Sequence, residues 1–182
     1  GDEEKARILE REKRAIMGYE EEILDYQKTI SEILREEGLG TVPCPAWYRD
    51  AAEGVFAELY GLAGLTPWVY DATPAYRDSS SAKLIGDRLY CLIDGKSVLQ
   101  PQRISRDRRA QLRRALLLST PQERAEKGFH EIYLHNGIRV TIYAGERTKP
   151  GGTAGVVINA LVPADVTVWD KGILFCQKAL IP

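Results

Sequence analysis

The chain has 182 residues, of which 44% are hydrophobic, so it can build a packed core in one ordinary domain with an appendage or in two small domains. Its formal net charge of -1 provides no overall field that would attract nucleic acid or an anionic membrane. Three widely separated cysteines and two histidines indicate neither a disulfide framework nor a zinc site, so no metal ligands are assigned. No apolar run is long enough to cross a membrane, and these features together predict a globular protein of a reducing cytoplasm.

Residues 3–37 are predicted to form one long helix. They contain no proline and a single glycine, Gly18, and apolar residues recur at intervals of seven. The two registers are Leu9, Ile16, Ile23 and Ile30, and Tyr19, Tyr26 and Ile33. This narrow stripe must be covered either by the chain's own domain or by a second helix or another subunit. We therefore assign residues 1–40 to a heptad helix for oligomerisation or partner contact, with Leu9, Ile16, Ile23 and Ile30 as its interaction residues.

The segment from residue 41 to residue 160 is expected to be an α+β domain with an antiparallel sheet, because helical and alternating patterns follow one another along it. The first predicted elements are a helix over 47–60, a glycine-punctuated turn over 61–68 that ends in an apolar anchor at Trp68, a polar loop over 71–81 and a hairpin over 88–99 around Asp94-Gly95. Two helices follow: one runs from its Ser105 cap to Leu118, and a short one begins with the capping box Thr120-Pro121-Gln122-Glu123 and ends at Gly128. The last predicted elements are a hairpin over 129–143 around Asn136-Gly137 and a strand over 153–158. Residues 161–182 are interpreted as a linker toward a missing C-terminal domain, so the chain is expected to be a fragment.

The helix after Ser105 is predicted to bury Leu112, Ala115 and Leu116 and to turn its other face, which is rich in arginine, toward solvent. The arginines of this segment are Arg103, Arg106, Arg108, Arg109, Arg113 and Arg114. Such a cluster is typical of a solvated face, of a contact with an acidic partner, or of a phosphate-binding surface. The helix lacks aromatic residues for base stacking, which argues against nucleic acid. We assign Arg106, Arg109 and Arg113 as interaction residues.

No catalytic residue is assigned, because each candidate motif lacks a required part. Gly95-Lys96-Ser97 resembles the end of a nucleotide-binding P-loop, but Tyr90 stands where that motif needs its first glycine. His130 and His135 lie five residues apart on a predicted strand and therefore on opposite faces. We expect that this chain alone is not an enzyme.

Arg139, Arg147 and Lys149 lie on or beside the glycine-rich loop that follows the Asn136-Gly137 turn. Guanidinium groups give paired donors, and glycine permits close approach of a backbone, so these side chains could reach a phosphate bound in an adjoining domain. An ordinary basic surface loop is the alternative.

Several stretches between residues 51 and 162 resemble the N-terminal domains of the hexameric secretion ATPases, which power type II and type IV secretion and the assembly of type IV and tight-adherence pili. The segment over 55–69, VFAELYGLAGLTPWV, is similar to a helix that leads through glycines into a "G-L-x-P-L-L" anchor. The segment over 87–96 resembles a strand that ends in an "x-x-D/N-G-K/R-L" turn, residues 104–118 resemble the arginine-bearing helix that follows, and residues 136–140 are similar to "D-G-x-R-V". The chain departs from the pattern over 82–86 and at Asn159, where the family has an arginine, so a nucleotide contact there is in doubt.

The resemblance implies a PAS-like α+β domain that sits above an ATPase domain and moves when ATP is bound or hydrolysed. It implies that Arg139 and Arg147 contact the nucleotide, that ATP and Mg²⁺ belong to the parent protein, and that the partners are the missing ATPase domain, neighbouring subunits and a membrane-anchored secretion component. The location would be the cytoplasm, at the inner face of the membrane through those partners. The alternative function is a stand-alone accessory or nucleic-acid-associated protein of a mobile element, which would use the helix between Arg103 and Arg114.

Overall fold

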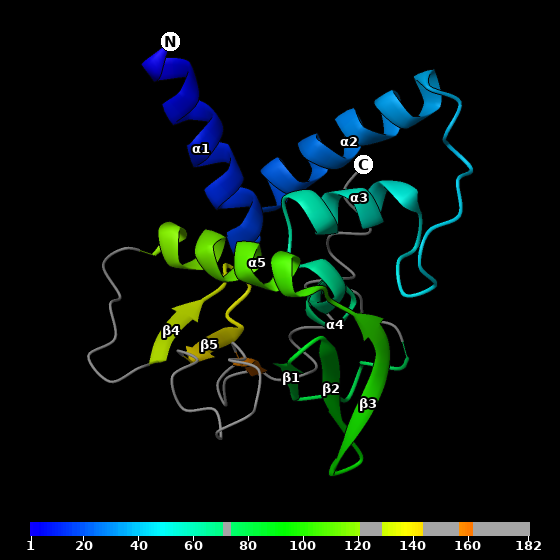
Figure 1. Ribbon diagram of the computed structural model, residues 1–182, viewed down its shortest axis with the longest axis vertical. Coiled ribbons are helices and arrows are strands. Elements are labelled where there is room, and N and C mark those ends of the chain that lie inside the picture. Colours follow the sequence, from blue (N-terminus) through cyan, green and yellow to red (C-terminus); the bar gives the residue numbers. More distant parts are fainter. Residues whose placement is uncertain (71–73, 121–128, 144–156, 162–182) are drawn as a thin grey trace.

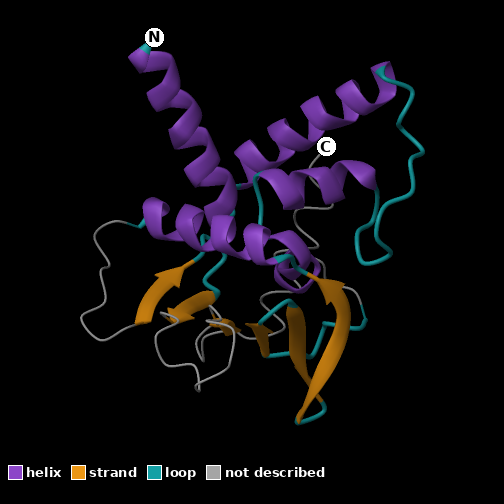
Figure 2. Cartoon of the chain, in the orientation of Figure 1, coloured by secondary structure: helices purple, strands orange, loops and turns teal. Residues whose placement is uncertain are grey.

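The computed structural model describes residues 1–70, 74–120, 129–143 and 157–161, and it confirms the expected α+β class. The helices are α1 (Asp2–Met17), α2 (Glu20–Glu36), α3 (Ala51–Leu59), the short 3-10 helix η1 (Ala63–Leu65), α4 (Thr66–Tyr70) and α5 (Arg106–Ser119), and the strands are β1 (Ser81–Ile85), β2 (Arg88–Ile93), β3 (Lys96–Arg103), β4 (Phe129–Tyr133), β5 (Arg139–Tyr143) and β6 (Val157–Leu161). Figures 1 and 2 show the helices gathered on one side of the strands, with α5 lying between α1 and the sheet.

The strands form one antiparallel sheet in the order β3-β2-β1-β6-β5-β4. Its first and last strands in sequence pair at the centre, where Ala82 lies opposite Ala160. Strand β1 was not predicted, because it begins at the last of three successive serines and has no turn pair before it. Strand β3 continues past the predicted end at Leu99 and contains Pro101, which an edge strand tolerates because it needs no hydrogen bond on its open side. The strand predicted over 153–158 is observed as Val157–Leu161.

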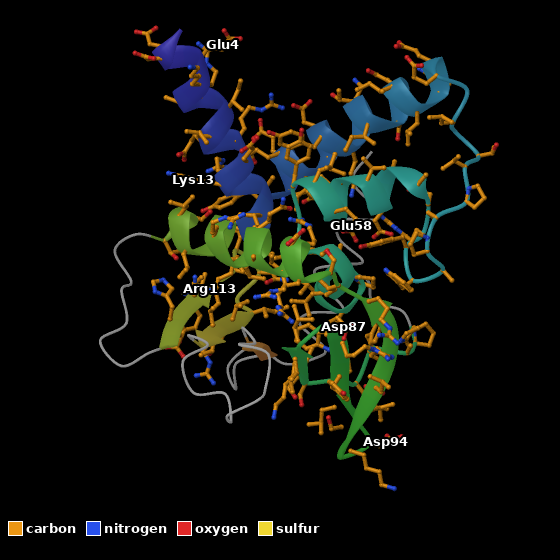
Figure 3. The ribbon with its side chains drawn as sticks, in the orientation of Figure 1. Glu4, Lys13, Glu58, Asp87, Asp94 and Arg113 are labelled. Atoms are coloured by element: carbon orange, nitrogen blue, oxygen red, sulfur yellow. The ribbon has the colours of Figure 1, made fainter. Side chains whose placement is uncertain are left out.

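Both hairpins around the predicted turn pairs are confirmed, but they use different turns. Asp94 and Gly95 both have positive φ, 51° and 75°, as the two-residue type I′ turn requires, and Figure 3 shows Asp94 at the tip of the β2–β3 hairpin. The second turn has three residues, because Leu134 donates its N–H to the carbonyl of Ile138 at 2.9 Å and, in this loop, Gly137 alone takes a positive φ. This is the three-residue hairpin with a left-handed glycine, so the tight two-residue form expected for Asn136-Gly137 is wrong.

The main core lies between the sheet and helices α4 and α5. Leu84 and Leu89 from the sheet and Leu112 and Leu116 from α5 are fully buried in it. The predicted apolar anchor Trp68 is also fully buried, and its indole Nε1 donates to Ser79 Oγ at 2.9 Å. The inward positions predicted for α5 are therefore confirmed.

Helix α3 begins four residues later than the predicted start at Trp47. Asp50 caps it, because its side chain accepts a hydrogen bond from the N–H of Glu53 at 2.9 Å. Ser105 caps α5 in the same way by accepting from the N–H of Arg108, as predicted. The short helix predicted after Thr120, most of the glycine-rich loop and most of residues 161–182 lie outside the described residues.

The long N-terminal helix is two helices, so the prediction of one continuous heptad helix is wrong. The chain breaks at Gly18, which has a φ of 97° and ends α1 in a left-handed conformation that glycine adopts without strain. Figure 1 shows α1 and α2 diverging from this junction, and we refer to the pair as the helical arm. Both helices of the arm pack on the chain's own domain, where Ile16 of α1 joins the main core and Ile30 of α2 joins a second cluster with Phe56 of α3.

Candidate functional site

Arg139, which the family resemblance assigns to a nucleotide contact, is the first residue of β5 and is held between two strands. It lies opposite Tyr133 of β4 on one side and Leu161 of β6 on the other. Its Nε is 3.3 Å from Glu131 Oε1, and the two side chains are 38% and 39% exposed. An ion pair this accessible to water contributes at most about 1 kcal/mol. Glu131 therefore holds the guanidinium only weakly, and another anion can take its place.

The turn before β5 fixes the backbone that carries Arg139. The N–H of Gly137 donates to the carbonyl of Leu134 at 2.9 Å, and the N–H of Ile138 donates to Oδ1 of Asn136 at 3.2 Å. Ile138 is 1% exposed and anchors the start of the strand in the core. Arg139 is therefore presented from a rigid position, whereas its expected companions Arg147 and Lys149 lie outside the described residues.

The two histidines are separate, but the prediction that they lie on opposite faces of one strand is wrong, because only His130 is on a strand. His130 is buried on β4 and its Nε2 lies 3.2 Å from Thr120 Oγ1. His135 is exposed in the β4–β5 turn, where its ring stacks on Tyr19. No local pattern links Tyr19 with His135, because the two residues belong to segments far apart in the chain. The one signal in the sequence is that an aromatic residue, Tyr19, directly follows Gly18, where the helix could break.

Only part of the arginine cluster around α5 faces solvent, as was expected of all of it. Arg108 is mostly buried and its Nη2 donates to the carbonyls of Ala57 and Gly61, at 2.7 and 3.1 Å. These carbonyls are at the end of α3, where carbonyl groups lack partners within the helix. Burial lowers the pKa of Arg108 and the charge of Glu58 opposes this, but the guanidinium stays charged.

Arg109, assigned to an interaction surface, is 6% exposed and is therefore buried in this chain. Its spacing could have shown this, because Arg109 lies three residues before the buried Leu112 on one helical face. Arg103 pairs with Asp87 at 2.8 Å at the surface. Of the other arginines of α5, Arg113 is partly exposed, and Arg106 and Arg114 are exposed. The basic surface is thus smaller than the sequence suggested.

The seam assigned to a partner is likewise divided between core and surface. Ile16 and Ile30 are 4% and 8% exposed, and Ile23 packs against the cluster of Ile30. Leu9 is 56% exposed and lines a groove of about 180 Å³ with Leu59 of α3 and Leu118 of α5. Covering of the seam by the chain's own domain, which the sequence left open, holds for Ile16, Ile23 and Ile30, whereas Leu9 remains exposed.

Catalytic and metal-binding arrangements are not found in the described part of the chain. No group of three or more His, Cys, Asp or Glu residues there is placed to hold a metal ion. Lys96 and Ser97 are exposed residues of the β2–β3 hairpin, which has a strand on each side of the turn instead of the helix that a P-loop needs. Among these residues, no helix has the length and apolar character to cross a membrane.

Comparisons with known proteins give a distant likeness and no family. No family model matches the chain, and no curated protein matches it. Among solved structures, the chain is similar to the VirB11 ATPase from the Brucella suis type IV secretion system, in a complex with sulphate, with a TM-score of 0.40 and 16% sequence identity. The match covers 65% of this chain and 36% of the VirB11 chain, so this chain spans little more than a third of the length of that ATPase.

Proposed function

We propose that this chain is a non-catalytic regulatory and interaction domain of a secretion or pilus-assembly ATPase, and that Arg139 contacts the nucleotide of the motor domain. The observation that carries the proposal is the position of Arg139, on a strand fixed by a hydrogen-bonded turn and next to a replaceable anion, Glu131. A guanidinium can offer two parallel donors to a phosphate group, and a rigid strand holds them in one direction.

The segments that carry the family resemblance fall on well-formed parts of the fold, which supports the proposal. The stretch over 55–69 runs from α3 through η1 into the buried Trp68. In the stretch over 87–96, Asp94-Gly95 forms the expected turn. The stretch over 136–140 is the turn that presents Arg139. In the parent protein, ATP and Mg²⁺ would be bound by the motor domain, and this chain would add Arg139 and Arg147 to the nucleotide cleft.

The helical arm is proposed as the part that meets neighbouring subunits or a membrane-anchored partner. Leu9 of α1 and Ile33 of α2 are 56% and 52% exposed. The nucleic-acid alternative is less well supported, because Arg108 and Arg109 are committed inside the domain and Arg103 is paired with Asp87.

The test is steady-state ATP hydrolysis by the protein that the complete gene encodes. Arg139→Ala should lower kcat/KM about 10- to 100-fold, since a hydrogen bond to a charged group is worth roughly 1.5–3 kcal/mol and each 1.4 kcal/mol is a factor of ten. Arg139→Lys should recover part of the loss. The matched control is Arg114→Ala, at an exposed arginine of α5. A gene without a nucleotide-binding domain, or an Arg139→Ala protein with normal activity, would overturn the proposal.

A further inference from the structure

The junction of the helical arm is fastened directly to the turn that presents Arg139. The backbone N–H of His135 donates to the carbonyl of Met17, the last residue of α1, at 2.7 Å. The imidazole ring of His135 stacks on the ring of Tyr19, with centroids 4.1 Å apart and planes 17° from parallel. Thus one residue of the turn holds both ends of the break between α1 and α2.

A third planar group completes this contact. The guanidinium carbon of Arg14 lies 3.9 Å from the centre of the Tyr19 ring, and its Nε pairs with Glu22 of α2. Two groups this close to the centre of one ring cannot share a face of it, so Tyr19 lies between Arg14 and His135. We call Arg14, Tyr19 and His135 the junction cluster. Because stacking and cation–π contacts both depend on ring geometry, the cluster fixes the direction in which α2 leaves α1.

The junction has little freedom to move within the domain. The N–H of Gly18 donates to the carbonyl of Ala15, and the N–H of Tyr19 donates to that of Arg14, which is the paired bonding of a glycine-ended helix. A Cβ added to Gly18 would lie 2.5 Å from the hydroxyl of Tyr70, so this glycine is seated against α4. A displacement of the arm must therefore act on the parts that touch the junction, and the β4–β5 turn is one of them.

The path from the turn to Arg139 is short and is hydrogen-bonded throughout. Leu134 and Ile138, on either side of the three-residue loop, are joined by the bond from the Leu134 N–H to the Ile138 carbonyl. Arg139 follows Ile138 directly. His135 therefore lies four residues before Arg139 in the same hydrogen-bonded hairpin.

We propose that the junction cluster couples the helical arm to Arg139, so that a partner bound to the arm alters the position of this guanidinium. The proposal rests on the proposed function of Arg139 for its biological meaning, whereas the coupling itself concerns contacts within this chain. Both helices of the arm carry exposed apolar residues, Leu9 of α1 and Ile33 of α2, for a partner to contact, and the cluster is where the arm meets the β4–β5 turn.

The first experiment measures hydrogen exchange of backbone amides in the 182-residue chain. Tyr19→Ala should accelerate exchange of the His135 and Leu134 amides roughly 2- to 10-fold, as the loss of an aromatic stack predicts. Tyr19→Phe keeps the ring and should behave as the parent. The matched control is Tyr26→Ala, which removes the similar stack on Tyr60, at 4.4 Å, that fastens the arm to α3 instead of the turn. Amides of β2 serve as the internal reference for global unfolding. Unchanged exchange at His135 in Tyr19→Ala would overturn the coupling.

The second experiment separates the coupling from the proposed function. In the complete protein, ATP hydrolysis is compared for Tyr19→Ala, Arg139→Ala and the double variant. If the cluster acts through Arg139, Tyr19→Ala should change the rate in the parent and should have no further effect when Arg139 is absent. Independent, additive effects would overturn the coupling while leaving the role of Arg139 intact. Normal activity of Arg139→Ala would instead overturn the proposed function, and the exchange experiment would still decide the coupling.

Discussion

Arg108 provides a direct test of whether the arginines of α5 are structural. In Arg108→Ala, the carbonyls of Ala57 and Gly61 lose the guanidinium that donates to them at 2.7 and 3.1 Å. Both residues are buried, and a buried acceptor left without a partner costs about 1–3 kcal/mol. Two such acceptors predict that the free energy of unfolding falls by about 2–6 kcal/mol. The lower end applies if water enters the space that the side chain leaves.

The assay is urea unfolding followed by circular dichroism, with Arg114→Ala as a control of the same type at an exposed position of α5. The control should change stability by no more than about 0.5 kcal/mol, as expected for a surface substitution. Arg108→Lys keeps the charge but lacks the planar fork, so it should restore part of the loss. If Arg108→Ala is as stable as the control, Arg108 does not stabilise the end of α3 and is free to serve as a surface cation.

Three further changes test other parts of the structure. Gly18→Ala should lower the melting temperature, because a left-handed alanine costs about 1–2 kcal/mol and its Cβ would meet Tyr70; an unchanged value would show that the break tolerates side chains. Burial of its hydroxyl raises the pKa of Tyr70, so the folded chain keeps a proton that the unfolded chain releases near pH 10. The free energy of unfolding should therefore fall as the pH rises from about 10, and it should fall less steeply in Tyr70→Phe. Equal slopes of stability against pH in the two proteins would contradict this. Removal of residues 1–37 should cost about 3–6 kcal/mol through loss of buried Ile16 and Ile30, whereas removal of the exposed residues 1–10 should cost little; similar melting of both forms would show that the arm is an independent appendage.

The sequence predicted local structure correctly wherever one short segment determines that structure. Asp94-Gly95 can adopt two successive positive φ values, and the Ser105 hydroxyl accepts from an N–H three residues later, so neither feature depends on distant residues. The alternating segments on either side of Asn136-Gly137 likewise predicted the two strands of this hairpin. These elements place Arg139, which is why its position beside the turn was predicted correctly.

The break at Gly18 could not be predicted in the same way. One glycine in a helix costs only about 1 kcal/mol, which a heptad pattern of this length outweighs. The contacts that favour the break come from Tyr70 and His135, which are more than fifty residues away in sequence. Arg108 was misjudged for a related reason, because helical spacing shows which side a residue faces but not that unpaired carbonyls of α3 lie opposite it.

The central pairing of β1 with β6 makes completion of the sheet depend on the end of the described chain. Until Val157–Leu161 is in place, β1 and β5 each present an unpaired edge, one on the three-stranded unit of β1, β2 and β3 and the other on the β4–β5 hairpin. Unpaired edges bind other strands readily, so a nascent or truncated chain would be prone to aggregate through them. During synthesis, the two units must wait for the same five residues before they become one sheet. The folding rate of this protein is therefore limited by its last strand, β6, because contacts between distant segments form slowly.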